Sequence, residues 1–341
     1  MKNHLIYIGN HLKTANPTTL DLLVSKFGKE GYKVKVYSSY KFKLWRLLHM
    51  CWGVLIAPQK ALVVIDTYST LNFYYAFSVA MLCKLRKLPY IPILHGGNLP
   101  NRLKQSPKLS HFLFSNAFVN IAPSNYLFEA FHSKFKTLVI PNLLHLKQYE
   151  FHSRSFESPR LLFVRAFQDI YNPLMAVKVL HQLLHKYPQA KLGIVGPFKD
   201  DSIHEVKQYI KSNQLESAVE ITGKLSKADW IEKSKAYNLF INTSKVDNTP
   251  VSVLEAMALG LVVVSTNVGG VPYIIENEKQ GFLVESDDEV AMVKAITHLM
   301  ENTDVAQSIR ENARQKVEQF DWEVIKHKWF KIFDDVEQIN L

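Results

Sequence analysis

The 341-residue sequence is poor in cysteine, with only Cys51 and Cys83. Both lie among apolar residues, and their spacing matches neither a metal-binding nor a redox pair. A disulfide framework, a cysteine-ligated metal and thiol redox chemistry are therefore excluded as the basis of the fold or the function. We expect two buried free thiols in a reducing compartment rather than a disulfide.

Two short motifs that bind cofactors in other enzymes are also missing. No Asp-x-Asp occurs in the chain, so the usual carboxylate handle for Mg²⁺ or Mn²⁺ is absent. No Gly-x-Gly-x-x-Gly follows any predicted strand, which leaves a dinucleotide-dependent oxidoreductase poorly supported. There is also no internal repeat and no low-complexity tract.

The sequence shows no targeting or membrane-spanning signal. No signal peptide precedes the first predicted strand, HLIYIG. One uncharged stretch, Thr67 to Cys83, is short and contains Ser, Thr and Asn, which favours a buried helix over a membrane span. We therefore expect a cytoplasmic protein.

Acidic residues are scarce in the first half of the chain. Residues 1–150 contain 19 Lys and Arg against 5 Asp and Glu (+14), and the remainder contains 22 against 26 (−4). Within the basic half, Tyr40 to Leu55 interleaves Lys41, Lys43 and Arg46 with Trp and Leu. Such a segment can lie as a peripheral helix on anionic lipid at the inner face of the membrane. It can equally pack on its own domain with a solvated basic edge. Nucleic-acid binding ranks below both, because no recognised module accompanies the charge.

What the chain does contain is a repeated alternation of predicted strands and helices. Its length suits two α/β domains of about 150 residues each, and 47% of its residues are hydrophobic, enough to fill two cores. Alternation of this kind predicts parallel, doubly wound sheets. A polar, charged linker at Tyr149 to Arg160 sets the boundary near residue 158. The sequence thus predicts domains at 1–158 and 159–324, followed by an amphipathic helix at about 325–341.

The segment from Asp247 to Pro272, DNTPVSVLEAMALGLVVVSTNVGGVP, is the most informative part of the chain. Asn248 or Thr249 can cap a helix that begins at Pro250 and ends at a glycine. The helix N-terminus presents unpaired N–H groups and the positive end of a dipole, which favour an anion such as a diphosphate. Glu255 lies in the second turn, where a desolvated carboxylate requires donors such as sugar hydroxyls.

A buried β-branched strand, Leu261 to Thr266, and a glycine turn complete this segment. By itself, such a strand–helix–strand unit is also found in ordinary α/β cores. The pattern, however, resembles the donor-binding signature of the family 4 retaining glycosyltransferases, in which two acidic residues eight apart flank a "PxSxLEAMAxG" helix before "TxxGGxPE". Further similarities extend over nearly the whole chain: a glycine loop after the first strand, a mid-chain His-Gly, "PSNYLFEAF", "IPNLL", an Arg after the first C-terminal strand, and "FDWEVI".

The resemblance implies the GT-B fold, in which two Rossmann-like, doubly wound α/β domains face each other across a cleft. The first domain would bind the acceptor and the second the donor, with the terminal helix crossing back to the first domain. The implied reaction is retaining transfer of a hexose-type sugar from a nucleoside-diphosphate sugar, such as a UDP-sugar, to a membrane-held glycan or lipid-linked acceptor. This reaction would belong to cell-surface polysaccharide or lipopolysaccharide biosynthesis and would need no cofactor and no metal.

Charge builds on the diphosphate as the sugar leaves, so cations or N–H dipoles must lie beside it. Without a metal handle, this role falls on Arg165 and on the helix N-terminus, and the resemblance supplies the other site residues. The catalytic residues expected are His95, Arg165 and Glu255. The donor-binding residues expected are Gly9, Asn10, Asn172, Lys224, Asp247, Asn248, Thr249, Pro250, Val251, Ser252 and Glu255. On position alone, the acceptor would contact Asp66, Asn98 and Arg102, while His95 orients sugar hydroxyls and the leaving phosphate oxygen deprotonates the acceptor.

The chain departs from the family pattern in three places. A Lys usually follows about five residues after the Arg, but here Tyr171 or Asn172 must donate to the phosphate, or Lys224 must reach it. Asp247 replaces the usual Glu, and the loop Gly9 to Thr19 lacks the common Gly-Gly pair. These departures also allow an alternative, a catalytically weakened binding or scaffold protein at the membrane.

Overall fold

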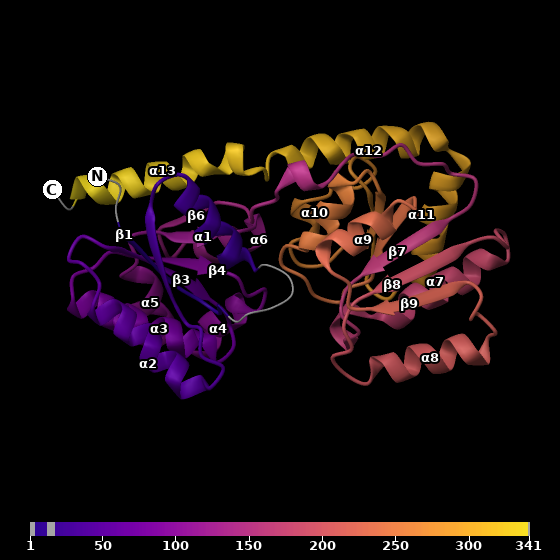
Figure 1. Cartoon of the computed structure of the whole chain (residues 1–341). Helices are drawn as coiled ribbons and strands as arrows, with labels where there is room; N and C mark the ends of the chain where they lie inside the picture. Colours follow the sequence, from indigo (N-terminus) through magenta and orange to yellow (C-terminus); the bar gives the residue numbers. More distant parts are fainter. Residues whose placement is uncertain (1–3, 12–17, 340–341) are drawn as a thin grey trace. The chain divides into compact units, whose positions relative to one another are not determined.

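The computed structural model describes residues 4–11 and 18–339, and the chain divides into two compact units (Figure 1). Unit 1 comprises Met1–Leu143 together with Trp322–Leu341, and unit 2 comprises Leu144–Asp321. Two α/β units were predicted, and both are present. The division between them, however, falls at Leu143 and Leu144 rather than near residue 158.

Unit 1 is built on a parallel six-stranded sheet in the order β2-β1-β3-β4-β5-β6. Its strands are β1 (His4–Ile8), β2 (Lys33–Tyr37), β3 (Leu62–Thr67), β4 (Tyr90–Leu94), β5 (Asn120–Ala122) and β6 (Thr137–Val139). Its helices are α1 (Thr19–Lys29), α2 (Lys43–Leu55), α3 (Asn72–Leu85), α4 (Leu99–Gln105), α5 (Pro107–Ser115), α6 (Asn125–Phe131) and α13 (Trp322–Ile339). The order of the strands reverses between β1 and β3, so a crevice forms there at the carboxyl ends of the strands.

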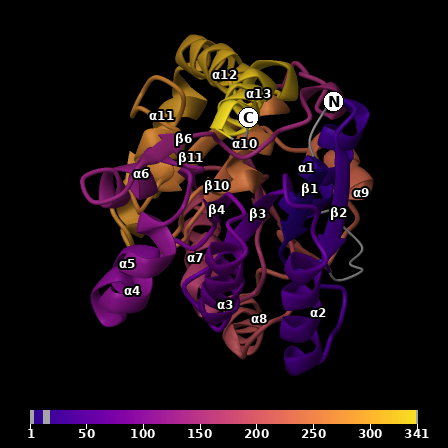
Figure 2. The ribbon, with the colours of Figure 1, turned by 90° about the vertical axis from the view of Figure 1, so that its left-hand side faces the viewer.

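Alternate residues of β1 and β3 supply two separate cores in unit 1. Ile6 and Ile65 pack with α2, α3, α5 and α6 on one face, whereas Leu5 and Val64 pack with α1 and α13 on the other. Because successive side chains of a strand point to opposite faces, a sheet covered on both sides requires continuous apolar runs. The stretch LVVI in β3 is such a run. In Figure 2, α3 and α2 are seen next to each other below the sheet.

Unit 2 has a second parallel six-stranded sheet, in the order β12-β11-β10-β7-β8-β9. Its strands are β7 (Arg160–Val164), β8 (Lys191–Val195), β9 (Val219–Gly223), β10 (Leu239–Asn242), β11 (Val262–Thr266) and β12 (Phe282–Val284). Its helices are α7 (Pro173–Leu184), α8 (Ser202–Ser212), α9 (Lys227–Ser234), α10 (Val251–Ala258), α11 (Glu289–Glu301) and α12 (Thr303–Glu318). The strand order reverses between β7 and β10, which is where a Rossmann-type sheet opens its binding crevice.

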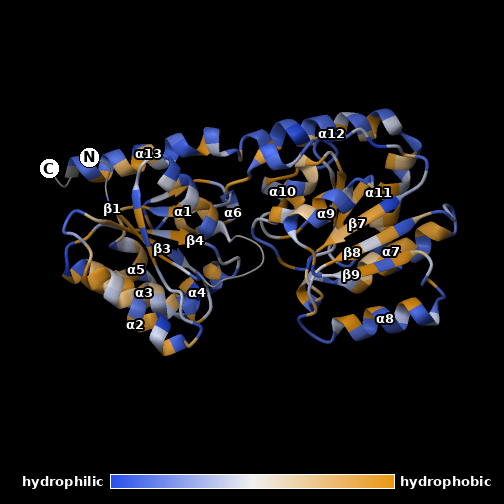
Figure 3. Ribbon diagram, viewed as in Figure 1, coloured by the Kyte–Doolittle hydropathy of each residue, from blue (hydrophilic) through white to orange (hydrophobic). Residues whose placement is uncertain are grey.

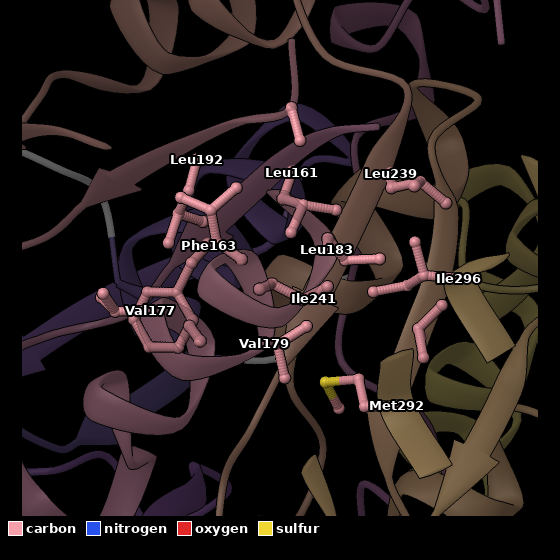
Figure 4. Packing of buried hydrophobic residues seen from close by; sticks show 14 of the residues in the cluster. Leu161, Phe163, Val177, Val179, Leu183, Leu192, Leu239, Ile241, Met292 and Ile296 are labelled. Carbon is pink, nitrogen blue, oxygen red and sulfur yellow. The ribbon is translucent and has the colours of Figure 1, made fainter. Parts of the chain in front are cut away.

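Unit 2 also buries a core on each face of its sheet. Figure 4 shows one of them, where Leu161 and Phe163 of β7 meet Val177 and Leu183 of α7, with Met292 of α11 nearby. The other core joins α9, α10 and the end of α12 to the opposite face. The sheet of unit 2 is therefore covered by packed side chains on both faces.

The predicted linker between the domains is a fixed part of unit 2. The Arg154 guanidinium donates to the backbone oxygens of Ser234 (2.6 Å) and Leu259 (2.9 Å). Leu144 and Tyr149 belong to one of the unit 2 cores. The polar composition that suggested a linker reflects these side-chain contacts to backbone, and the boundary moves forward accordingly.

The terminal helix α13 is part of unit 1, as expected, and begins at Trp322 rather than near residue 325. Phe27 of α1 lies edge-on to the rings of Trp322, Trp329 and Phe333, at centroid distances of 5.7, 5.5 and 5.2 Å. This aromatic cluster fixes the helix to its face of the sheet.

The uncharged stretch Thr67 to Cys83 forms the end of β3 and most of α3, with Phe73 and Val79 fully buried. Within the described residues, no helix has both the length and the apolar character needed to cross a membrane. The two cysteines are free thiols, as predicted, although only Cys83 is fully buried. Burial raises the pKa of the Cys83 thiol to about 12, so this group stays protonated and unreactive.

Candidate active site

In unit 2, the predicted donor residues lie in loops at the carboxyl ends of two neighbouring strands. Arg165 directly follows β7, and Asp247 to Pro250 lie in the loop between β10 and α10. Because β7 and β10 are paired and flank the point where the strand order reverses, their loops meet in one crevice. Residues 82 positions apart are thereby brought into contact.

The guanidinium of Arg165 donates a hydrogen bond to Asp247 and lies over the ring of Tyr171, 5.0 Å from its centroid. The two charged side chains are only 16% and 12% exposed. Burial raises the pKa of the Asp247 carboxyl, although Arg165 and the N–H of Asn248 act in the opposite direction. The Arg165 Nε is buried and has no partner among the described residues, so a donor of the guanidinium remains available to an anion.

The N-terminus of α10 opens beside this pair. Neither predicted cap is observed: Pro250 occupies the N-cap position, no side chain caps the helix, and the first helical residue is Val251. The reason is the extended conformation of Pro250 (ψ 100°), which places it outside the helix. The hydroxyls of Thr249 and Ser252 are buried and have no partner within the described part of the chain. Together with the N–H groups of Val251 and Ser252, which precede the first backbone hydrogen bonds of the helix, they form a set of donors for an anion.

The glycine turn after β11 holds the acidic loop in position. A Cβ atom on Gly269 would lie 1.9 Å from the backbone oxygen of Asp247, and one on Gly270 would lie 1.5 Å from the backbone oxygen of Asn248. The N–H of Gly270 also donates to the backbone oxygen of Asp247 (3.0 Å). Only glycine permits this approach, so the pair is required by the loop it supports.

Glu255 projects from α10 and is 4% exposed. Its Oε1 accepts hydrogen bonds from the Tyr149 hydroxyl (2.8 Å) and from the ammonium of Lys227. Burial, reinforced by the charge of Glu255, raises the pKa of Tyr149, which keeps its hydroxyl a donor. No hydrogen bond reaches Oε2 from residues 4–11 or 18–339, so this oxygen remains available to a ligand hydroxyl.

Tyr149 and Lys227 are site residues that sequence reasoning missed. Tyr149 lies in the segment interpreted as a linker. Lys227 is the first residue of α9, three positions after the predicted Lys224, which is exposed and has no partner among the described residues. Ser226, the N-cap of α9, is the signal that could have placed Lys227 in the first turn of that helix.

Asn172 and Tyr171 are the other candidates for the missing cation contact, and the structure gives them different roles. Asn172 has a left-handed backbone (φ 47°), caps α7 through the N–H of Met175 and donates to Asp287 (2.7 Å). Its side chain is therefore used by the fold. Tyr171 instead faces Arg165 and stays beside the predicted phosphate site.

Unit 1 holds a second group of predicted residues, at the carboxyl ends of β1, β3 and β4. His95 Nε2 lies 2.8 Å from Asp66 Oδ1, and the Tyr7 hydroxyl donates to the same oxygen (3.0 Å). The imidazole also stacks on the ring of Tyr68, with centroids 5.2 Å apart. Burial, with the charge of Asp66, raises the pKa of Tyr7. Asp66 thus orients His95 instead of pointing freely towards a substrate.

Gly9 directly adjoins this pair, because a Cβ atom there would lie 2.4 Å from Asp66 Oδ2. The neighbouring Asn10 accepts a hydrogen bond from Arg46 of α2 (3.2 Å). Residues 12–17 of the predicted loop Gly9 to Thr19 lie outside the described residues. The two predicted site residues of this loop, Gly9 and Asn10, are both described and border the His95 group.

The remaining acceptor candidates stand at the start of α4. Asn98 is exposed and accepts from Asn101 (2.6 Å). The Arg102 guanidinium donates to the Ser69 oxygen (2.8 Å) and lies over Phe73. Arg102 therefore fastens α4 to the loop after β3, while Asn98 is open to solvent. No group of three or more potential metal-ligating side chains occurs within the described residues.

Comparison with known proteins gives matches over both units. The model of the family "Glycosyl transferases group 1" matches residues 148–316. An uncharacterized glycosyltransferase of Haemophilus influenzae is 28% identical over 45% of this chain, and the match spans 42% of that protein. The GalNAc-alpha-(1->4)-GalNAc-alpha-(1->3)-diNAcBac-PP-undecaprenol alpha-1,4-N-acetyl-D-galactosaminyltransferase of Campylobacter jejuni is 25% identical over 91% of this chain and 88% of its own.

Solved structures share the same arrangement of elements. Sucrose-phosphate synthase from Thermosynechococcus elongatus superimposes with a TM-score of 0.81 at 16% identity, covering 99% of this chain and 100% of that one. Anabaena Alr3699/HepE, solved in complex with UDP, gives a TM-score of 0.79 at 19% identity, covering 98% and 100%. At these identities the likeness concerns the fold.

Proposed function

Because the chain belongs to the glycosyl transferases group 1 and has the GT-B fold, we propose that it is a retaining, metal-independent transferase that uses a nucleoside-diphosphate sugar. This proposal rests on one observation: Arg165 binds Asp247 in the loop that leads into the uncapped N-terminus of α10, where the strand order of unit 2 reverses. A fixed cation and aligned N–H dipoles are what a departing diphosphate requires. UDP is the donor nucleotide favoured by the solved complexes of HepE with UDP and UDP-glucose.

In the proposed reaction, the bond between the anomeric carbon and the phosphate oxygen breaks as the diphosphate leaves. The acceptor oxygen bonds to the anomeric carbon from the same face, and its proton passes to the leaving phosphate oxygen. Arg165 and the amides of α10 stabilise the growing negative charge. Glu255, held by Lys227 and Tyr149, accepts from the donor's ribose hydroxyls through Oε2. His95, oriented by Asp66, binds sugar hydroxyls from unit 1.

We place the acceptor among glycans and lipid-linked precursors of cell-surface polysaccharides, with the enzyme on the cytoplasmic side of the membrane. Two relatives from Campylobacter jejuni are named for transfer to diphospho-undecaprenol-linked sugars. Another, WcaL of Escherichia coli, is named as a putative colanic acid biosynthesis glycosyltransferase, and 30% of the residues align identically over 40% of this chain.

A second candidate function follows from the engaged side chain of Asn172. The family's second phosphate-binding cation is missing, and Asn172, one of its possible substitutes, is occupied by Met175 and Asp287. A binding protein that retains a nucleotide but transfers no sugar would tolerate that loss.

A panel of nucleotide sugars tests the proposal and separates the two candidates. A bound donor should raise the melting temperature, since a ligand at about 100 times its Kd adds roughly 2.7 kcal/mol of stability. Slow donor hydrolysis that survives a chelator, with retained anomeric configuration in the product, is the expected result. Donor binding without hydrolysis or transfer would support the binding protein, and turnover that disappears with chelator and returns with Mg²⁺ would contradict metal independence.

Arg165→Ala provides the residue-level test. We expect a loss of about 2–4 kcal/mol of transition-state stabilisation, because one preorganised charge on the leaving group is removed. Arg160→Ala is the matched control, since Arg160 lies at the opposite end of the same strand and is exposed. Near-normal turnover of Arg165→Ala would remove this residue from the mechanism.

A further inference from the structure

The middle of unit 1 is almost free of acidic residues. Between residues 31 and 128 the only carboxylate side chain is that of Asp66, which is buried and paired with His95. The same span contains twelve basic residues: Lys33, Lys35, Lys41, Lys43, Arg46, Lys60, Lys84, Arg86, Lys87, Arg102, Lys104 and Lys108. The span therefore carries a large positive net charge, which favours anionic partners.

This basic span also exposes large apolar side chains on two helices that pack side by side, α2 and α3 (Figures 1 and 2). On α2, Leu44, Leu48, Trp52 and Leu55 follow helical spacing and are 49–57% exposed, and Trp45 is 59% exposed. Figure 3 shows apolar residues along both helices. We define the α2–α3 face by its exposed apolar residues, which are Phe42, Leu44, Trp45, Leu48, Trp52, Leu55, Ile56, Tyr74, Met81 and Leu85.

So many exposed apolar side chains on two neighbouring helices mark a place of contact. The buried sides of both helices already fill the core of unit 1, through Met50 and Val54 of α2 and Phe73 and Val79 of α3. The alternative of a helix that merely packs on its own domain thus accounts for the inner residues of α2 but leaves the outer ones unexplained.

We propose that the α2–α3 face docks the protein onto an anionic lipid bilayer. This inference rests on the proposed function, in which the acceptor can be lipid-linked, and it selects that class of acceptor. Trp and Tyr side chains favour the boundary between head groups and acyl chains, and each basic residue near an anionic surface adds attraction. Exposed Lys41 and Lys43 stand at the start of α2 for this purpose.

The charge of the face argues against a second copy of the chain as its occupant. Two copies meeting through this face would bring Lys41, Lys43 and Lys60 towards their own equivalents, with no exposed carboxylate between residues 31 and 128 to pair with them. Like charges brought together in this way disfavour association. An anionic lipid surface supplies the missing negative charge.

One side chain joins this face to the unit 1 site. Arg46 of α2 donates to the Asn10 side chain (3.2 Å) and to the backbone oxygens of Tyr40 (2.8 Å) and Lys41 (3.1 Å). The start of α2 therefore lies directly against the loop after β1, which borders Asp66 and His95. With α2 docked on the bilayer, the head group of a lipid-linked acceptor would lie next to that loop.

The tryptophans provide a built-in assay. Of the five in the chain, Trp45 and Trp52 lie on the α2–α3 face, whereas Trp230, Trp322 and Trp329 are at most 3% exposed. Phosphatidylglycerol-containing vesicles with brominated acyl chains should quench the wild-type emission, and a Trp45→Phe/Trp52→Phe variant should lose this quenching while still sedimenting with the vesicles. Quenching that persists in this variant would show that another part of the molecule meets the lipid.

Charge removal tests the electrostatic part. Lys41→Gln/Lys43→Gln should lower partitioning onto phosphatidylcholine–phosphatidylglycerol vesicles about 30-fold at low salt, and wild-type binding should fall as sodium chloride rises. Lys134→Gln/Lys331→Gln, which changes two exposed lysines of unit 1 away from the face, should retain binding. Arg46 is left unchanged because it touches Asn10.

The UDP-induced shift in melting temperature, measured on the same variants, separates this proposal from the proposed function. Three results would overturn the docking face, even where the UDP shift is intact. They are vesicle binding that does not depend on lipid charge or salt, no vesicle binding, and salt-sensitive binding to duplex DNA without vesicle binding. If UDP does not raise the melting temperature of the wild-type protein, that result would instead count against the proposed transferase function. A dimer that dissociates when Trp45 and Leu48 are changed to Ser would assign the face to a second copy.

Discussion

Asp247 and Glu255 lie eight positions apart, and the structure places their carboxylates in different surroundings. Asp247 faces Arg165 in a pair with low exposure, and burial raises its pKa. Glu255 is held on one oxygen by Tyr149 and Lys227. A buried carboxylate requires such donors, since an unpaired charge would be costly to desolvate. At the scale of single residues, the site consists of two carboxylates, each positioned by its own cation.

Lys224, in the loop after β9, and Lys227, the first residue of α9, provide a matched pair for a test. Lys227→Met should weaken UDP binding by roughly 10- to 100-fold, because a charged hydrogen bond that orients Glu255 is worth about 1.5–3 kcal/mol. Lys224→Met should leave affinity almost unchanged, since Lys224 has no partner within the described residues. Isothermal titration calorimetry measures both. A larger loss for Lys224→Met would instead make Lys224 the substitute for the missing phosphate-binding cation.

At the scale of elements, the helix termini perform two different functions. α10 begins without a side-chain cap and leaves its first amides open beside Arg165. α1, in contrast, begins with a complete capping box, in which the Thr18 hydroxyl accepts from the Asp21 N–H and Asp21 accepts from the Thr18 N–H (2.8 Å). A capped start stabilises its own helix, whereas an uncapped start retains donors for a ligand.

The capping box of α1 predicts a dependence of stability on pH. Partial burial would raise the pKa of Asp21, but hydrogen bonds from Thr18 and His11 outweigh burial and lower it below its ordinary value of 3.8. Because the folded pKa is lower than the unfolded one, the stabilisation by Asp21 is complete above pH 3.8 and is lost as the pH falls through the folded pKa. The difference in unfolding free energy between wild type and Asp21→Asn should therefore shrink below pH 3.8.

Urea unfolding at a series of pH values measures this difference. Asp335→Asn, an exposed carboxylate on α13 of the same unit, serves as the control. Thr18→Ala should cost about 1 kcal/mol at neutral pH. A difference for Asp21→Asn that stays constant from pH 6 to pH 3 would contradict the assigned pKa direction.

At the scale of the whole molecule, the chain crosses between the units twice, at Leu143–Leu144 and at Asp321–Trp322. The segment after the first crossing packs into unit 2, where Arg154 donates to three backbone oxygens and the Tyr149 hydroxyl donates to Glu255. The segment after the second crossing, α13, packs against α1 of unit 1. Each unit therefore depends on residues that a simple division at one linker would remove.

Two fragments test this division. A fragment of residues 144–321 should fold and bind UDP, because it holds both cores of unit 2 and every contact to Glu255. A fragment of residues 159–321 should be less stable by at least about 3 kcal/mol, since it lacks Leu144, Tyr149 and Arg154. Chemical unfolding and UDP titration of both fragments decide the point, and equal stability would restore the boundary near residue 158.

Much of this arrangement could be predicted from local sequence. The apolar runs and turns predicted two doubly wound α/β units, and Asp247 to Pro272 predicted a loop, a helix, a strand and a glycine turn in that order. The errors are local shifts at element ends. The helix α10 begins at Val251 because the backbone of Pro250 is extended. The boundary between the units was predicted too late in the chain. The segment before residue 158 is polar because Arg154 binds backbone oxygens of unit 2, and a solvent-exposed linker would have a similar composition.

The sequence alone determined the alternation of strands and helices, the short helix α10 and the resemblance to the family, because these depend on periodicity, turn residues and a motif within a short stretch. Only the tertiary structure decided that Lys227 and Tyr149 reach Glu255 and that Asp66 holds His95. Tyr149 and Glu255 are separated by 106 positions. Contacts at such separations depend on strand order and on the reach of each side chain, which no local pattern records.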